Sequence, residues 1–264
     1  KRILLTNIYG VDIDQQAVEV TKLSLLLKVL EGENEETLET QRRLFHERAL
    51  PDLANNIKCG NSLVGPDFYE GRQMSLLDEE EVYRINAFDW QAEFQEVFQG
   101  ENPGFDAVVG NPPYIRIQSL RETQAFSADY FDTSYDAATT GNYDIYVLFA
   151  EKGLAVLNPS GYLGFICPHK FSNAKYGAGV RRLLARSHTV RELVHFREHQ
   201  VFEGATTYTC LLFLSKAPNT HFSLSKVSDL AAWRVNPEES YCGEVPTDTL
   251  TEGHWSFSSP AATR

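Results

Sequence analysis

Apolar positions along the chain recur at two spacings, one typical of strands and one typical of helices. Short apolar runs at residues 8–13 (IYGVDI) and 105–109 (FDAVV) predict strands. Residues 15–30 carry apolar side chains at helical spacing and follow Asp14, which has the chemistry of an N-cap. The remaining predicted elements are strands at residues 57–59, 162–167, 190–195 and 207–214, and helices at residues 143–157 and 179–186. Strands that alternate with helices predict an α/β protein with a layered sheet.

Two segments interrupt this alternation. Residues 31–52 hold seven acidic and three basic side chains and resemble an acidic, partly helical insertion. Residues 66–104 resemble a second insertion, with a helix that ends near Phe98. After about residue 217 the periodic pattern weakens and Pro, Ser and Thr increase. The sequence therefore predicts one main domain at residues 1–217, followed by a linker or the start of a separate domain at residues 218–264.

Composition excludes several classes of protein. Hydrophobic residues make up 42% of the 264 residues and charged residues 23%, which is enough for a core and excludes disorder as the main state. No apolar run approaches the length of a membrane span, and the first residues lack the pattern of a signal peptide. The four cysteines lie far apart with no CxxC pair, which argues against a zinc ribbon or a disulfide scaffold. This cysteine usage suits a reducing compartment, so we expect a cytoplasmic protein without a membrane partner.

Charge is distributed unevenly. The net charge of −12 argues against a simple nucleic-acid-binding protein. Residues 169–198, however, hold seven basic and two acidic side chains, a local charge of +5 that leaves −17 for the rest of the chain. This segment is either a solvated helix face or a local edge that faces phosphates. Under the second interpretation, the candidates for contacts with a DNA backbone are Lys170, Lys175, Arg181 and Arg182.

A stiff polar loop follows the strand predicted at residues 105–109. It consists of Gly110 and then Asn111, Pro112, Pro113 and Tyr114. Two consecutive prolines fix two φ angles and hold the chain extended, and the carboxyl end of a strand is where open α/β sheets bind ligands. The Asn111 side-chain oxygen and the Pro112 carbonyl are two acceptors that suit the two N–H groups of an amine conjugated to an aromatic ring. The alternative is a rigid turn with a buried asparagine, which the preceding strand makes less favourable.

Two weaker features precede this loop. Asp12 ends the first predicted strand, where an acid typically binds ribose hydroxyls, and Ile13 beside it would lie against an adenine ring. The alternative is that Asp12 or Asp14 only caps the next helix. Asn61, with Ser62 beside it, follows the strand at residues 57–59 and suits a contact with an adenine amino group, although a turn is the commoner explanation.

These three features, in this order, resemble the gamma-class N6-adenine DNA methyltransferases, and among them the large type IIG-like enzymes of restriction–modification and phage defence. The resemblance covers most of residues 8–217. It extends through residues 141–168, where it places Asp144, Tyr146 and Phe149 at the site or in the core. In the late segment at residues 201–214, Phe202 matches the aromatic residue that packs on the target base, with an ordinary core phenylalanine as the alternative.

The resemblance implies a Rossmann-like methyltransferase sheet with flanking helices, incomplete at its N-terminus. It implies S-adenosylmethionine as cofactor, bound through Asp12, Ile13, Asn61 and Ser62, and no metal. The target adenine of double-stranded DNA would be rotated out of the helix, with Tyr114 and Phe202 stacking on it. An endonuclease domain or subunit would lie outside this chain.

The sequence also departs from the family pattern. The family's Gly-rich first motif should precede residue 8, and Asn61 replaces the usual Asp of the third motif. We therefore expect a central fragment of a longer enzyme, inactive by itself. Three other functions stay open: a protein-glutamine N5 methyltransferase, a cytosine N4 methyltransferase, and a non-catalytic interaction fragment. The basic segment at residues 169–198 favours DNA over protein, and Asn rather than Ser at position 111 favours adenine over cytosine.

Overall fold

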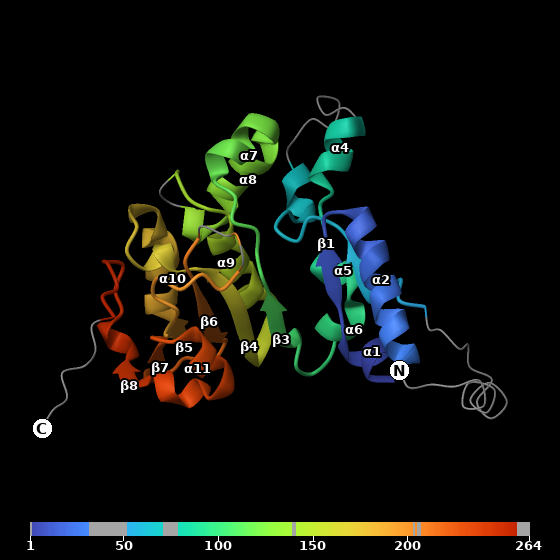
Figure 1. The fold of residues 1–264 in the computed structure, drawn as a ribbon. Helices are drawn as coiled ribbons and strands as arrows, with labels where there is room; N and C mark the ends of the chain where they lie inside the picture. The colour runs from blue at the N-terminus through green and yellow to red at the C-terminus, as the bar shows by residue number, and fades with distance from the viewer. Residues whose placement is uncertain are drawn as a thin grey trace, which may run out of the picture. The chain divides into compact units, whose positions relative to one another are not determined.

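The computed structural model describes residues 2–31, 52–70, 79–138, 141–202, 204 and 207–257. They form two compact units, residues 1–95 and residues 96–264, and each is considered by itself (Figure 1). Most of the acidic insertion expected at residues 31–52 lies outside the described residues.

The first unit is built on a pair of parallel strands, β1 (Gly10–Asp12) and β2 (Ile57–Cys59), in register from Gly10↔Ile57 to Asp12↔Cys59. Asp14 caps the following helix as expected, because its side chain accepts a hydrogen bond of 2.8 Å from the Gln16 N–H. The small core comprises Leu4, Val18, Leu53 and Ile57. The helices of this unit are α1 (Arg2–Asn7), α2 (Gln15–Leu30), η1 (Pro66–Tyr69), α4 (Glu79–Ile85) and α5 (Trp90–Glu93), with α6 (Gln95–Phe98) at the boundary.

The second unit is built on a six-stranded mixed sheet with the order β3-β4-β6-β5-β7-β8. Four strands, β3, β4, β5 and β7, run parallel to one another, while β6 and β8 run antiparallel to them. The carboxyl ends of the four parallel strands therefore lie at one edge of the sheet. The strands are β3 (Phe105–Gly110), β4 (Leu157–Pro168), β5 (Val190–His195), β6 (Thr209–Ser215), β7 (His221–Lys226) and β8 (Tyr241–Pro246).

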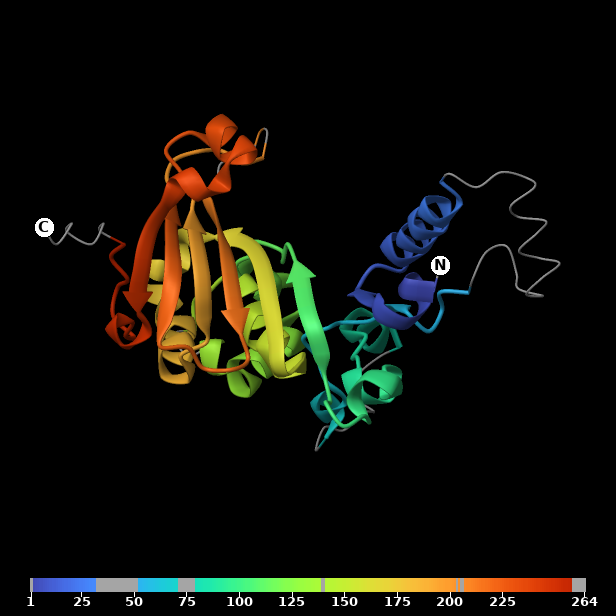
Figure 2. The ribbon, with the colours of Figure 1, turned by 90° about the horizontal axis from the view of Figure 1, so that it is seen from below.

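Helices α9 and α10 lie on one face of this sheet (Figure 2). Leu163 on β4 points to that face and is buried, whereas its neighbour Tyr162 is exposed, as a strand covered on one face requires. Helix α9 packs so closely on β4 that a Cβ added at Gly153 would lie only 2.3 Å from Leu163 Cδ1. The helices of this unit are α7 (Ile117–Thr123), α8 (Ala125–Ser134), η3 (Asp136–Ala138), α9 (Tyr146–Val156), η4 (His169–Ser172), η5 (Lys175–Gly177), α10 (Ala178–Ser187), α11 (Leu230–Val235), η6 (Pro237–Ser240) and η7 (Thr247–Thr249).

The boundary expected near residue 217 is not a break in the sheet. β7 pairs in parallel with β5, from Glu192↔Ser223 to His195↔Lys226, and β8 continues on the far side of β7. β7 and β8 therefore extend the same sheet beyond residue 217, with α11 and η6 between them. Within the described ranges, no helix is long and apolar enough to cross a membrane.

Candidate active site

The loop at residues 111–114 emerges from β3 at the edge of the sheet where the parallel strands end. The same edge carries η4, which follows β4, and the connection from β5 to β6. Phe202 lies in that connection and is 39% exposed. The topology therefore places two of the expected base-contacting side chains, Tyr114 and Phe202, at one edge of the sheet.

Asn111 is held by its neighbour within the loop. The Tyr114 hydroxyl donates a hydrogen bond to Asn111 Oδ1 over 2.8 Å, and the Ile166 carbonyl on β4 is a second acceptor at 3.2 Å. Pro112 is buried, while Asn111 and Pro113 are exposed. A side-chain amide oxygen accepts two hydrogen bonds, so Oδ1 keeps one acceptor position for a donor outside the loop.

Tyr114 acts here as a neutral donor. Burial, followed by the nearby thiols of Cys167 and Cys210, raises the pKa of its hydroxyl to about 12. Its ring meets the Tyr146 ring edge to face at 6.2 Å between centroids, and the Tyr146 hydroxyl lies 3.1 Å from that of Tyr176. The resemblance pointed to Tyr146, but sequence reasoning missed Tyr176, whose only signal was an aromatic residue in a short loop.

The chain beyond the loop is also anchored. The Ile145 N–H donates to the Ile115 carbonyl and the Ile117 N–H to the Tyr143 carbonyl, each over 2.8 Å. These two bonds tie the exit of the loop to the start of α9. The NPPY loop is thus fixed at both ends, by β3 before it and by this pairing after it.

The basic segment divides into exposed and buried side chains. Lys170 and Lys175 are exposed, and Arg182 is half-buried with its guanidinium 3.6 Å from Glu252. Arg181 is only 2% exposed. Its guanidinium donates to the carbonyls of Phe171 (2.6 Å), Ala174 (2.7 Å) and Glu252 (2.9 Å). The expected phosphate contact by Arg181 is therefore corrected to a structural role, because a buried guanidinium does not reach a DNA backbone.

In the first unit, Asp12 and Asn61 lie where the two parallel strands end. Asp12 is exposed, and its Oδ1 accepts from the Asp14 N–H over 2.8 Å, which leaves its second oxygen toward solvent. Ile13 beside it is 49% exposed. Asn61 is buried, and its side-chain oxygen accepts from the Leu63 N–H over 3.1 Å, as in a turn. The Ser62 carbonyl accepts from Trp90 Nε1 over 3.1 Å.

Comparison with known proteins identifies the family. The profile of the Eco57I restriction-modification methylase family matches residues 6–202. This chain belongs to that family. It is 34% identical over 257 residues to the type II restriction enzyme and methyltransferase RM.Eco57I of Escherichia coli, a match that covers 97% of this chain and 23% of that protein. It is 31% identical over 132 residues to the type II methyltransferase M.BstVI of Geobacillus stearothermophilus, covering 49% of this chain and 22% of that protein.

Solved structures share the fold of this Eco57I-family chain. The ATP-dependent type ISP restriction-modification enzyme LlaBIII, bound to DNA, has a TM-score of 0.56 at 13% identity, over 96% of this chain and 18% of that one. The DrdV–DNA complex has a TM-score of 0.52 at 14% identity, over 86% of this chain and 22% of that one. The α/β methyltransferase fold expected from the sequence is thereby confirmed, and the chain spans about a quarter or less of each of these proteins.

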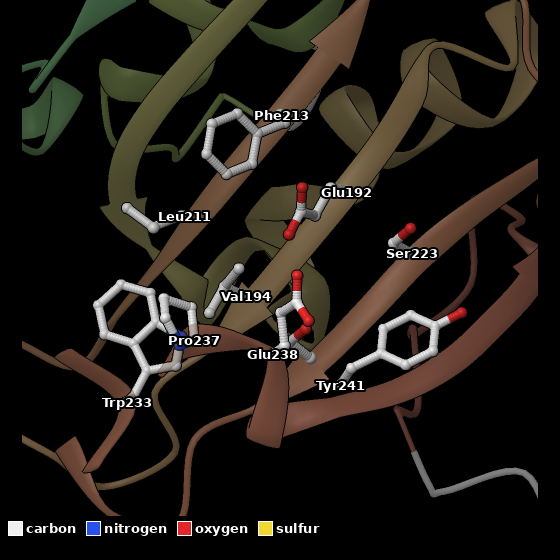
Figure 3. A pocket seen from close by; sticks show the side chains of 10 residues that line it. Glu192, Val194, Leu211, Phe213, Ser223, Trp233, Pro237, Glu238 and Tyr241 are labelled. Atoms are coloured by element: carbon white, nitrogen blue, oxygen red, sulfur yellow. The ribbon is translucent and has the colours of Figure 1, made fainter. Parts of the chain in front are cut away.

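One hollow of this family member lies on the sheet face rather than at its edge. Its volume is about 470 Å³, and Figure 3 shows Glu192, Glu238, Tyr241 and Trp233 around it. Burial, and then the charge of Glu244, raises the pKa of Glu192. An acidic lining of this kind repels phosphate, so this hollow does not suit a DNA backbone. Within the described residues, no three His, Cys, Asp or Glu side chains gather closely enough to hold a metal ion.

Two histidines pack against each other at the carboxyl edge. The His169 and His195 rings are 4.3 Å apart between centroids. Burial, with smaller effects of His169, Lys226 and Arg197, lowers the pKa of His195 to about 4, and burial also lowers the pKa of His169. Both rings are therefore neutral at pH 7.

The stability of the second unit should depend on pH through His195. The unfolded imidazole has a pKa of about 6.5, so between pH 6.5 and 4 the unfolded state binds more protons than the folded state, and stability is lost as pH falls. The wild type should lose unfolding free energy between pH 7 and pH 5, and His195→Gln should lose about 1 kcal/mol less. This figure is smaller than the full effect of the pKa shift, because the His195 ring is partly exposed to solvent. Urea unfolding at the two pH values measures this. A loss in His195→Gln equal to that of the wild type would contradict the assignment.

Proposed function

We propose that the protein carrying this chain transfers a methyl group from S-adenosylmethionine to the exocyclic N6 of adenine in double-stranded DNA. This reaction would be the modification activity of a restriction–modification or phage-defence enzyme. The observation that carries the proposal is Asn111 Oδ1, held by the Tyr114 hydroxyl at 2.8 Å at the exposed end of β3 and still able to accept from outside. Membership of the Eco57I family supports it.

The chemistry of the amine explains why this loop suits it. The lone pair of an amine on an aromatic ring is delocalised into the ring, so the nitrogen is a weak nucleophile. Asn111 Oδ1 and the Pro112 carbonyl would accept its two N–H groups, localise the lone pair on nitrogen and stabilise the positive charge that develops. Because the Tyr114 hydroxyl remains protonated, it keeps Asn111 oriented throughout.

The base has to leave the duplex to reach this loop. Extrusion costs a few kcal/mol of stacking and pairing. Stacking on Tyr114 and on Phe202 would recover about 1–3 kcal/mol per ring. Phe202 is exposed at the same edge of the sheet, which suits this role. Lys170, Lys175 and Arg182 are the remaining candidates for contacts with the DNA backbone.

The first unit suits the adenosine part of the cofactor. The free oxygen of Asp12 would accept from the ribose hydroxyls, and the exposed Ile13 offers an apolar surface to the adenine ring. Asn61, assisted by Ser62, would meet the adenine edge through its amide N–H₂, since its oxygen already serves the turn to Leu63. The bound cofactor supplies an activated methyl group, so the protein contributes orientation and electrostatics.

The name of RM.Eco57I combines a restriction enzyme with a methyltransferase, and this chain matches 23% of its length. We propose by analogy that DNA cleavage and recognition of the DNA site belong to parts of the protein outside residues 1–264, and that the protein acts in the cytoplasm.

Transfer of an isotope-labelled methyl group tests this proposal. The full-length protein is incubated with labelled cofactor and either genomic DNA or total cell protein. We expect the label in DNA. Label in protein glutamine would favour the protein-methylating alternative, and no transfer to either acceptor would favour a non-catalytic role.

A further inference from the structure

A second hollow opens at the same edge of the sheet as the NPPY loop. Its volume is about 780 Å³, within the range of roughly 300–1,000 Å³ typical of ligand sites. It lies at the carboxyl ends of β4, β5 and β7 and at the start of β6, and β4 lies between β6 and β3, the strand that leads into the NPPY loop. It is lined by His169, Asn173, His195, Arg197, Glu198, His199, Tyr208 and Ser228.

We propose that this hollow binds one further nucleotide of the DNA substrate, outside the site of the target base. In this arrangement Arg197 binds its phosphate and Tyr208 stacks on its base. The inference rests on the proposed function, because it takes DNA as the substrate.

A stack of flat rings forms one wall. His195 lies against His169, and His169 lies nearly parallel to Tyr208, with an interplanar angle of 16° and 6.3 Å between centroids. Tyr208 ends the stack and is 42% exposed. An exposed ring with a packed layer behind it is a rigid platform for a nucleobase, and such stacking tolerates any base.

Arg197 supplies the positive charge of the hollow. Because the pKa values of His169 and His195 are lowered, these two rings add no charge at pH 7, and Glu198 is the one acid among the lining residues. Arg197 is exposed and has a φ of 53°, a left-handed conformation that is uncommon for arginine. Its N–H donates to His195 Nδ1 over 2.9 Å, so the ring stack also fixes the backbone that presents the guanidinium.

His169 Nδ1 is buried and has no hydrogen-bond partner within the described part of the chain, so it offers no accessible donor or acceptor to a ligand in the hollow. The hollow of Figure 3 offers the opposite chemistry, with two glutamates and no arginine in its lining.

The test is the salt dependence of DNA binding by the full-length protein, measured on DNA that the wild type methylates. Each phosphate contact contributes about 0.9 to the slope of log K against log salt concentration. Arg197→Asn removes the charge while asparagine tolerates the left-handed backbone, so the slope should fall by about 1. Arg197→Lys should keep the wild-type slope.

Tyr208→Leu and Arg191→Asn complete the design. Tyr208→Leu should weaken DNA binding roughly tenfold with an unchanged slope, because stacking releases no counterions. Arg191, exposed on β5 and bonded to Asn219 Oδ1 over 3.3 Å, lies outside the hollow, so Arg191→Asn should keep both slope and affinity.

An unchanged slope in Arg197→Asn, or an equal fall in Arg191→Asn, would overturn the inference. If Arg197→Asn does not fold, wild-type affinity in a folded Tyr208→Leu overturns it instead. If the wild type methylates DNA and Arg197→Asn keeps the wild-type salt slope, this inference is wrong and the proposed function stands. A wild type that methylates no DNA defeats the proposed function.

Discussion

Asn111→Ala should lower the rate of methyl transfer by about 10²–10³-fold, the usual effect of removing one preorganised polar contact to a developing charge. The side chain is exposed, and its described contact is the hydrogen bond from Tyr114, so the folded state loses little. We therefore expect the loss in kcat, with an unchanged temperature of unfolding. Steady-state kinetics of methyl transfer to unmethylated DNA and a thermal melt measure the two effects.

Asn102→Ala is the matched control. Asn102 is also exposed and also precedes a proline, but it lies before β3 rather than after it, so its variant should keep full activity. Tyr114→Phe keeps the aromatic ring and removes only the hydroxyl that orients Asn111, and should cost roughly tenfold, in line with about 1 kcal/mol for a hydrogen bond. Normal methylation by Asn111→Ala would remove the basis of the two-acceptor account.

The largest effect on stability is expected at Arg181. Arg181→Met keeps the length of the side chain but leaves the carbonyls of Phe171, Ala174 and Glu252 without their buried donor. Loss of charged hydrogen bonds at a site only 2% exposed should cost about 3 kcal/mol. For a unit of this size that corresponds to a fall of roughly 6–12 °C in the temperature of unfolding.

Arg186→Met serves as the control, because Arg186 is exposed in the last turn of the same helix, α10. It should unfold within about 2 °C of the wild type, as surface substitutions change stability by under about 0.5 kcal/mol. Equal melting of the two variants would show that the buried guanidinium does not hold α10 to the segment around Glu252.

Local chemistry made some of the structure predictable from sequence. Helix α2 has the predicted bounds of residues 15–30, because Asp14 and the run behind it specify it locally. The stripe that this helix buries was not predictable. Val20, Leu23 and Leu27 follow the expected helical spacing, yet they are more than half exposed, while Val18 is buried against the small core of the first unit.

The candidate site shows the same division. Two prolines directly after an apolar run specify the loop at residues 111–114, so its place at the end of β3 followed from sequence. The burial of Arg181 did not, because it depends on carbonyls up to 71 residues away along the chain. Residues 221–226 alternate polar and apolar side chains, and Phe222 and Leu224 are each 1% exposed, so β7 could have been predicted from sequence. The edge strand β8 has no such alternation, because its side chains are partly or fully exposed.

The most direct test of the account is to identify the atom that receives the methyl group. DNA treated with the full-length protein and labelled cofactor is digested to nucleosides and analysed by mass spectrometry. The geometry at Asn111 predicts N6-methyladenine, formed about 10²–10³-fold more slowly by Asn111→Ala. Label on cytosine N4, or on a ring carbon, would contradict the central claim that this loop holds the exocyclic amine of adenine.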